Sequence, residues 1–211
     1  MSRIVVFGAG GRAGRTSVAE ARRRGHRVTA VVRDPARHPE LAADGVHVEA
    51  GDVTDPDGVA RLADGHDAAI SAVYDAGAEP GAFFTGAARA LVDGLPKAGA
   101  DRLIVVGLAS LLADASGVAL MDAPGYPQEY RSFFLGHAAG AAVFSTATTE
   151  LDWLIVSPAG DFDHGGARTG RYRTAPGDAA SRITYPDFAI ALLDEIDAPR
   201  HHRTHLGVEA G

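Results

Sequence analysis

Short apolar runs rich in β-branched residues recur along the chain, and segments of mixed apolar and polar residues separate them. The runs are Ile4–Phe7, Val28–Val32, Val46–Ala50, Ala68–Val73, Leu103–Val106 and Leu154–Val156. Because each run is almost continuously apolar, we expect strands of a parallel sheet that helices cover on both faces. Strands that alternate with helical segments are typical of βαβ units. The pattern therefore predicts an α/β fold with a doubly wound parallel sheet.

The intervening segments carry helical patterns, and the chain ends in a less regular region. The expected helices are Arg12–Arg24, Asp57–Ala63, Gly81–Lys97, Pro127–Thr146 and Pro186–Asp197. Short strands are expected at Arg182–Thr184 and His205–Val208, after the segment Gly160–Asp178, whose glycines are consistent with mobility; the sequence leaves open whether it closes over a ligand as a lid. A length of 211 residues fits one domain over 1–211, with about 158–211 forming a small lobe on the substrate side.

The balance of charge argues against a nucleic acid or a membrane as the partner. The formal net charge is -7, and Arg22–Arg24 is the one basic run. Both of those partners are anionic and favour clustered lysine and arginine. We interpret the run as the solvated end of a helix, where positive charge meets the negative pole of the helix dipole.

The chain contains no cysteine, which excludes disulfides and thiolate nucleophiles. Its first residues enter a strand pattern at Arg3 without the features of a signal peptide, so we expect a cytoplasmic protein. The segment Leu103–Met121 is apolar enough to resemble a membrane span, but Ser110 and Asp114 interrupt it. A buried strand followed by a loop fits this segment better.

The first predicted strand leads directly into a glycine-rich turn, Gly8–Gly14, which opens the first predicted helix. Glycine lets the backbone approach a diphosphate closely, and the start of a helix offers free N–H groups and the positive end of its dipole. The alternative is a strand-to-helix turn that is merely tight. We expect a Rossmann-type dinucleotide site, with Arg12 as a phosphate ligand. The cofactor-binding residues of the turn are Gly8, Gly10, Gly11, Arg12, Ala13 and Gly14.

Arg33, which follows the second predicted strand, indicates which cofactor binds. It lies about 20 residues after the turn, where an acidic residue would hold the ribose hydroxyl of NADH. A guanidinium can instead pair with a 2′-phosphate and stack on adenine, so NADPH is favoured over NADH. The alternative is that Asp34 serves the ribose, with the register shifted by one residue.

Further cofactor contacts are expected where other strands end, because ligands of open α/β sheets bind at the carboxyl ends of the strands. Asp52 follows the third strand and could face the adenine amino group, whereas Ser71 and Ala72 are small enough for a ribose to approach. An ordinary loop is the alternative at both places. The residues at these ends are Asp52, Val53, Ser71, Ala72, Val73, Gly107, Ser157, Pro158 and Ala159.

Taken together, several of these segments make the chain resemble a known family over nearly its whole length. They are Gly8–Gly14, Arg33, Gly51–Val53, Ser157–Ala159, Thr169–Tyr172, Ser181–Tyr185 and Asp187–Ala189. The resemblance is to the atypical short-chain dehydrogenase/reductases, and within them to the NmrA-like NADH-flavin reductases and biliverdin reductase B-like enzymes. It implies an NAD(P)H-binding monomer or homodimer with an open cleft for a planar acceptor.

The catalytic residues are less well marked than the cofactor turn. Typical short-chain dehydrogenases carry Tyr-x-x-x-Lys, whereas Tyr130 is followed four positions later by Phe134, so the lysine that would activate the tyrosine is missing. His137 matches in position a histidine of the flavin reductases, although a merely packed histidine is the alternative. Ser110 and Tyr130 are the other hydroxyls expected to face the site. The catalytic candidates are therefore His137, Tyr130 and Ser110.

These features predict hydride transfer from NADPH to a small planar acceptor such as a flavin or a quinone. Such a reductase need only hold donor and acceptor face to face, because the cofactor supplies the difficult chemistry. The alternatives are an NmrA-like regulator that binds NAD(P) without turnover, and a redox-neutral isomerase or cyclase on the same fold. His201, His202 and His205 are interpreted as part of a solvated terminal strand, and no metal site is predicted.

Overall fold

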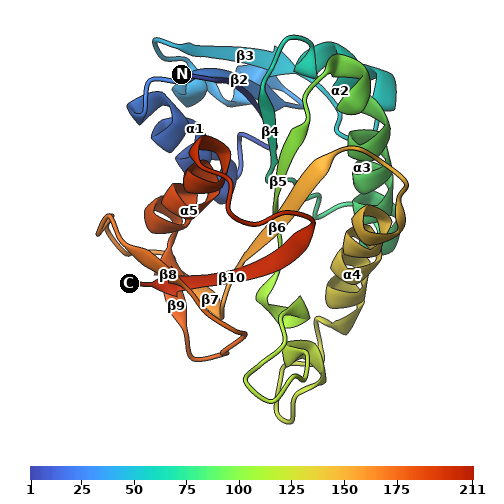
Figure 1. Ribbon diagram of the computed structural model, residues 1–211, viewed down its shortest axis with the longest axis vertical. Coiled ribbons are helices and arrows are strands. Elements are labelled where there is room, and N and C mark those ends of the chain that lie inside the picture. Colours follow the sequence, from blue (N-terminus) through green and yellow to red (C-terminus); the bar gives the residue numbers. More distant parts are fainter.

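An eight-stranded sheet runs through the centre of the computed structural model, which describes residues 1–211 (Figure 1). In spatial order the strands are β3 (Val46–Ala50), β2 (Arg27–Val32), β1 (Arg3–Phe7), β4 (Ala68–Ser71), β5 (Arg102–Val106), β6 (Asp152–Pro158), β10 (Thr204–Ala210) and β8 (Tyr172–Thr174). Every pair of neighbours is parallel except β10 and β8. The predicted Rossmann-type α/β fold is confirmed.

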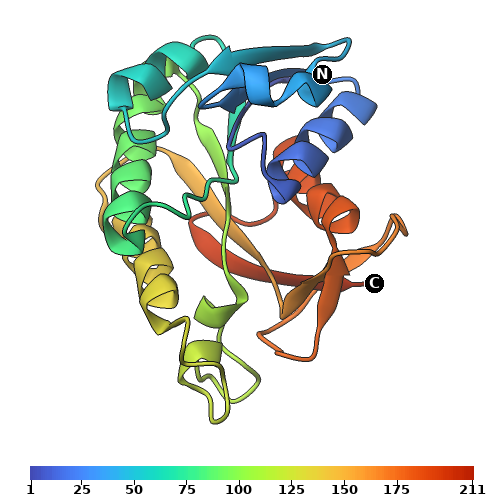
Figure 2. The same cartoon turned by 180° about the vertical axis from the view of Figure 1, so that it is seen from behind.

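Two groups of helices cover the two faces of the sheet (Figure 1 and Figure 2). The first group is α1 (Arg12–Arg23) and α5 (Tyr185–Asp197), and the second is α2 (Pro56–Ala63), α3 (Pro80–Gly94) and α4 (Arg131–Thr146). Each group packs on its own apolar core. Ile4 and Val6 of β1 point into the core beneath α1 and α5, and Val5 and Phe7 point into the other core. Both faces of the strand are buried, which explains its unbroken apolar run.

Several boundaries differ from those predicted. The fourth strand ends at Ser71 rather than Val73, and α4 begins at Arg131 rather than Pro127. The residues before α4 form a loop because the Gln128 amide donates hydrogen bonds to two backbone carbonyls, those of Met121 and Tyr126. A helix there would require a different backbone path.

The glycine-rich segment after β6 contains two strands that the sequence did not predict. These are β7 (Asp161–Asp163), which pairs with β9 (Arg182–Thr184) in a separate two-stranded sheet, and β8, which closes the edge of the main sheet. Runs of three residues are too short for a periodic pattern to reveal them. Since α5 and β10 belong to the main layers, only the β7–β9 pair of the expected C-terminal lobe has a sheet of its own.

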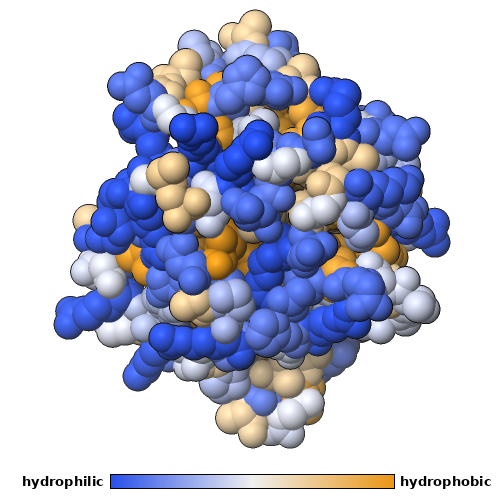
Figure 3. Space-filling view, turned by 45° about the horizontal axis from the view of Figure 1, so that its top comes forward, coloured by the Kyte–Doolittle hydropathy of each residue, from blue (hydrophilic) through white to orange (hydrophobic).

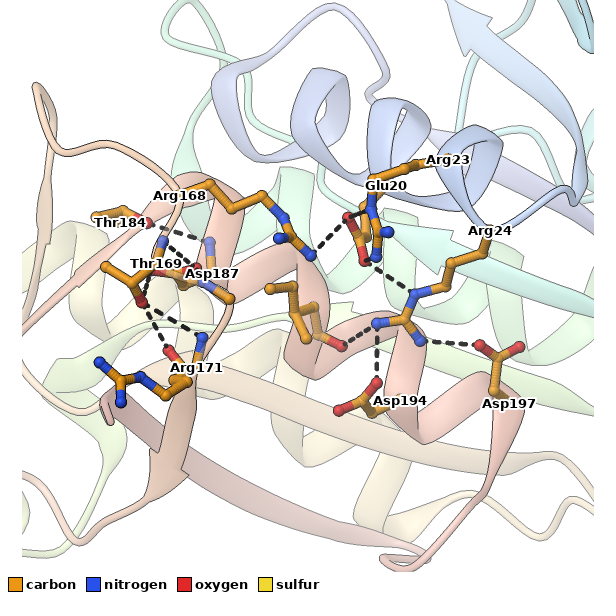
Figure 4. A network of polar contacts seen from close by, with 12 residues as sticks. Glu20, Arg23, Arg24, Arg168, Thr169, Arg171, Thr184, Asp187, Asp194 and Asp197 are labelled. Carbon is orange, nitrogen blue, oxygen red and sulfur yellow. Dashed lines mark hydrogen bonds and ion pairs between the residues drawn. The ribbon is translucent and has the colours of Figure 1, made fainter.

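The basic run at the end of α1 is not simply solvated, because α5 brings carboxylates to it (Figure 4). The Arg24 side chain is only 15% exposed and pairs with Glu20 at 2.9 Å, and with Asp194 and Asp197 at 2.8 Å each. Burial alone would raise the pKa of Glu20, but hydrogen bonds from Arg23 and Arg24 lower it to about 2. The solvated interpretation was therefore wrong for Arg24, which joins α1 to α5.

The same network anchors the segment that leads into β8 (Figure 4). The backbone N–H groups of Thr169 and Gly170 donate to the buried carboxylate of Asp187, in the first turn of α5. Arg168 reaches back to Glu20 of α1 at 3.6 Å. The glycine-rich segment is thus tied near its middle to both helices of this face.

The outer surface is mostly hydrophilic, with small hydrophobic patches set among polar side chains in the view of Figure 3. None of the helices combines the length and the apolar character needed to cross a bilayer. The stretch Leu103–Met121, which resembled a membrane span, forms β5 followed by short 3-10 turns. Leu103 and Ile104 are fully buried in the sheet, which accounts for part of the apolar composition of this stretch.

Candidate functional site

Two adjoining hollows open where the parallel strands end. The first, here the glycine cleft, lies over the carboxyl ends of β1 to β4 and is lined by Gly8, Gly10, Gly11, Arg33, His38, Asp52, Ala72, Tyr74 and Asp75 among others. The second, here the apolar pocket, lies between the sheet, α3 and α4 and is lined by Ser71, Phe84, Val105, Gly107, His137, Ala141 and Ile155 among others. Val73 lines both hollows, so they meet at this residue.

Glycine is required at both ends of the turn between β1 and α1. Gly8 has a φ of +76°, and a Cβ there would lie 2.3 Å from the carbonyl oxygen of Ala72. A Cβ at Gly14 would lie 2.2 Å from the carbonyl oxygen of Gly8, so this glycine lets α1 pack closely on the turn. At Gly11 a Cβ would make only ordinary contacts. Gly8 and Gly14 therefore fix the shape of the turn, whereas Gly11 keeps its surface open.

The start of α1 is free of side-chain caps. Asp55, Glu79 and Thr184 cap α2, α3 and α5 with their side chains, but no side chain caps α1 at Gly11. The first N–H groups of a helix have no acceptor within the helix. Those of α1 have no side-chain acceptor, as is also true of α4, but only α1 begins at the glycine cleft, where the positive end of its dipole favours an anionic ligand.

His38 was not predicted as a site residue, yet its ring lies against the turn. A Cβ at Gly10 would come within 2.4 to 2.9 Å of three atoms of the imidazole. The ring lies 3.3 Å from Glu40, which also pairs with Arg15 of α1 at 3.2 Å. Since His38 lies between two 3-10 turns, Pro35–Arg37 and Pro39–Leu41, well past β2, no strand-end pattern could have revealed it.

Arg33 and Asp75 face each other at the rim of the glycine cleft. The Arg33 guanidinium, 64% exposed, donates to a carboxylate oxygen of Asp75, which follows β4. The carboxylate of Asp34 instead accepts the N–H of Ala36 and caps its own 3-10 turn. Arg33 rather than Asp34 therefore lines the cleft, which leaves the shifted-register alternative without support.

Other predicted cofactor residues have partners within the chain. Asp52 lines the cleft while its carboxylate accepts the N–H and the hydroxyl of Thr54, at 2.9 and 2.7 Å. The Arg12 guanidinium contacts the ring of His164 next to β7 instead of entering the cleft. Ala13 accepts hydrogen bonds from two hydroxyls of α1 through its carbonyl oxygen.

The end of β6 lies behind the apolar pocket rather than in it. The Ser157 hydroxyl is fully buried and lies 2.7 Å from the Nε2 atom of His205 on β10. Gly107 separates this pair from the pocket, because a Cβ at Gly107 would lie 2.5 Å from the Ser157 oxygen. Pro158 and Ala159 line neither hollow. Of the residues predicted after β5 and β6, only Gly107 reaches the pocket.

His137 is the one catalytic candidate that lines the apolar pocket. Its ring packs on Phe84, with ring centres 3.7 Å apart, and meets Phe133 edge-on at 4.8 Å. Burial lowers the pKa of His137 to about 4. The imidazole is therefore neutral at physiological pH, and it can offer a hydrogen bond but holds no proton ready to transfer.

The two predicted hydroxyls do not join His137. Tyr130 is 58% exposed and precedes the first turn of α4, where its ring packs on Phe134 outside the pocket. Ser110 is fully buried and its hydroxyl has no hydrogen-bond partner, although the next residue, Leu111, lines the pocket. Neither hydroxyl lines the apolar pocket, contrary to our expectation, because the segment between β5 and α4 buries Ser110 and leaves Tyr130 exposed to solvent.

The C-terminal histidines have acidic or hydroxyl partners from distant parts of the chain. His201 lies 2.7 Å from Glu195, and His202 lies 2.8 Å from Asp152. His205 is partly buried against Ser157, and burial lowers its pKa to about 4. The interpretation of these histidines as a solvated strand was therefore wrong for His205. No group of three histidine, cysteine or acidic side chains could hold a metal ion.

Comparison with known proteins agrees with this geometry. The model of an NAD(P)H-binding family matches residues 8–199. YwnB of Bacillus subtilis, a protein of uncharacterized function, is 36% identical over 98% of this chain and 97% of its own. A solved structure of a Streptococcus pneumoniae protein, a proposed NADH-flavin reductase, is 30% identical with a TM-score of 0.83 and full coverage of both chains.

A further solved structure, from Burkholderia pseudomallei, is 38% identical with a TM-score of 0.86 and covers 99% of this chain and 100% of its own. It is named as a proposed exported protein, so the cytoplasmic location expected from the sequence stays a prediction. The matched range includes the glycine turn, the rim residues and both hollows. This chain belongs to the NAD(P)H-binding family of atypical short-chain dehydrogenase/reductases.

Proposed function

We propose that this protein is an NADPH-dependent reductase that passes a hydride to a small planar acceptor such as a flavin or a quinone. The observation that carries this proposal is the junction of two unlike hollows at Val73. One has an uncapped helix start and an arginine paired with an aspartate at its rim, and the other is apolar and aromatic. A dinucleotide that crosses such a junction has its diphosphate on the first side and its nicotinamide near the second.

The residues of the glycine cleft suit the diphosphate and the adenosine half of the cofactor. The uncapped N–H groups of α1 and the bare surface of Gly11 favour a close anionic ligand. Arg33 at the rim supports recognition of a 2′-phosphate, because a guanidinium binds phosphate oxygens with two parallel hydrogen bonds. These features favour NADPH over NADH.

The apolar pocket would act by position and by exclusion of water. When bound, the nicotinamide supplies the hydride itself. Phe84 and Phe144 line the pocket and offer apolar aromatic surface to a planar acceptor. His137, neutral among them, could orient a carbonyl or ring nitrogen through a hydrogen bond. No residue of the pocket need transfer a proton, since a flavin or a quinone can take one from water.

The test is oxidation of NADPH by the purified protein with a panel of flavins and quinones, followed as loss of absorbance at about 340 nm. Ala141→Leu, which adds bulk to the pocket, is expected to lower kcat/KM for the acceptor at least about tenfold. Ala142→Leu, at the next, exposed position of α4, is the matched control and should change little. Tight NADPH binding without oxidation by any acceptor would refute the reductase and favour a regulator or a redox-neutral enzyme.

A further inference from the structure

The ion pair between Arg33 and Asp75 crosses the rim of the glycine cleft. Arg33 follows β2 and Asp75 follows β4, and in the sheet these two strands are separated by β1. One carboxylate oxygen of Asp75 accepts the N–H of Gly77 at 2.9 Å, and the other accepts from the Arg33 guanidinium. Asp75 is therefore held by its own turn in a position that meets the arginine.

The two partners differ in how far their side chains are exposed to solvent. The Arg33 side chain is 64% exposed and reaches the pair from the outside, whereas that of Asp75 is 23% exposed. Hydrogen bonds from the Gly77 N–H and from Arg33 lower the pKa of Asp75. The carboxylate thus stays ionised at neutral pH, and the cation expected to receive a 2′-phosphate is already neutralised by the protein.

We propose that Asp75 is a specificity-determining residue that weakens the preference of this protein for NADPH over NADH. A 2′-phosphate must displace the carboxylate from Arg33 or bind beside it, and in both cases the two negative groups oppose each other. A ribose hydroxyl carries no charge and leaves the ion pair in place. This inference rests on the proposed binding of a nicotinamide dinucleotide, because it concerns the adenosine end of the same cleft.

Asp75→Asn tests the inference with little change in shape. The amide oxygen can still accept the Gly77 N–H, while the negative charge is removed. Exposed ion pairs are weak, so we expect NADPH to bind about fivefold more tightly and NADH to change by less than about twofold. Isothermal titration of both nucleotides with the full chain gives the ratio Kd(NADH)/Kd(NADPH), which should rise about fivefold.

Asp57→Asn is the matched control. Asp57 is 93% exposed on α2 and does not line the cleft, so the same loss of charge should leave the ratio unchanged. High salt screens exposed charges, and the effect of Asp75→Asn should shrink as salt is raised. Should the melting temperature of this variant fall, Asp75→Ser, which also offers an oxygen to Gly77, repeats the test.

The outcomes separate this inference from the proposed function. A ratio that is unchanged in Asp75→Asn, or that rises equally in Asp57→Asn, overturns the role of Asp75 while nucleotide binding itself stands. A wild-type chain that binds neither nucleotide overturns the proposed function and the inference together. A rise in Kd(NADH)/Kd(NADPH) confined to Asp75→Asn supports the role of Asp75 and the nucleotide site on which it depends.

Discussion

The glycine cleft and the apolar pocket lie side by side, yet they hold their ligand-facing groups in opposite ways. In the cleft the backbone is fixed by glycine contacts, while the charged side chains Arg33 and Asp75 lie exposed and paired with each other. In the pocket the side chains are packed, and the imidazole of His137 is wedged between aromatic rings. The cleft therefore has a rigid backbone and charged side chains that can change partners. The pocket has packed side chains that fix its apolar shape.

This difference suggests what each half can select. Charges that can change partners discriminate between ligands that differ by a phosphate, because breaking an exposed ion pair costs little. A packed apolar wall discriminates by size and flatness, since it has few polar groups that an acceptor must match. We expect strict recognition of the cofactor diphosphate, moderate choice between NADPH and NADH, and a broad range of planar acceptors.

The largest effect is expected at Gly8, where the backbone of the cleft is set. Gly8→Ala would place a methyl group 2.3 Å from the carbonyl oxygen of Ala72, at a φ of +76°. Because the obstacle is backbone, the turn itself must shift. We expect a loss of about 2 to 4 kcal/mol in unfolding free energy and no measurable NADPH binding. Thermal melting and nucleotide titration measure the two losses.

Gly11→Ala separates the cofactor from the fold. A methyl group there meets no atom of the protein closer than 3.5 Å, so the melting temperature should stay within about 2 °C. If the diphosphate lies against this turn, the same methyl group should weaken NADPH binding at least about tenfold. Unchanged affinity in Gly11→Ala would mean that the nucleotide binds elsewhere.

The next effect concerns the charges of the cleft. Arg33→Gln removes the guanidinium, and a hydrogen bond from a charged group to a phosphate is among the stronger polar contacts. NADPH binding should weaken by about 10- to 100-fold, and NADH binding by much less. Fluorescence titration of the two reduced nucleotides compares them directly. Equal losses for both would show that Arg33 serves the adenine rather than the 2′-phosphate.

The outcome at Arg33 also bears on what the sequence could predict. The β-branched runs identified the six successive parallel strands from β1 to β6, because a short, unbroken apolar run is typical of a strand that is buried on both faces. The glycine turn and Arg33 were found because their positions relative to β1 and β2 are set by local geometry. Features that are set by residues close in sequence can be predicted from the sequence.

Features that depend on distant chain were missed. Asp75 and His38 enter the glycine cleft from loops whose paths no periodic pattern describes. Arg24 and His205 were judged solvated because their partners, Asp197 and Ser157, lie far away along the chain. Tyr130 was expected to face the site from a helix over Pro127–Thr146, but α4 begins only after it. The partners of charged side chains can be identified only from the three-dimensional structure, because they lie on distant elements.

The smallest effect on activity is expected at His137, where the apolar pocket can be examined separately from the cleft. His137→Phe keeps an aromatic ring against Phe84 and removes the titrating group. Since burial holds the pKa of His137 at about 4, the imidazole is neutral through the physiological range and donates no proton at a useful rate. The rate of acceptor reduction should fall by less than about tenfold, and a loss above about 10⁴-fold would show acid–base catalysis.

The stability of the same variant tests the neutral imidazole directly. The unfolded chain protonates this group below pH 6.5, whereas the folded chain protonates it only below about 4. Between these values the unfolded state binds more protons, so the wild-type protein loses stability as the pH falls from 6.5 to 4 and no more below that. At pH 5 the lowered pKa of His137 reduces the free energy of unfolding by about 2 kcal/mol, and that of His205 reduces it by a similar amount. His66, whose pKa burial also lowers, contributes in the same direction. Denaturant melts at pH 7 and pH 5 should therefore show an acid-induced loss in His137→Phe that is about 2 kcal/mol smaller than in the wild type. An undiminished loss would mean that the pocket admits water to the ring.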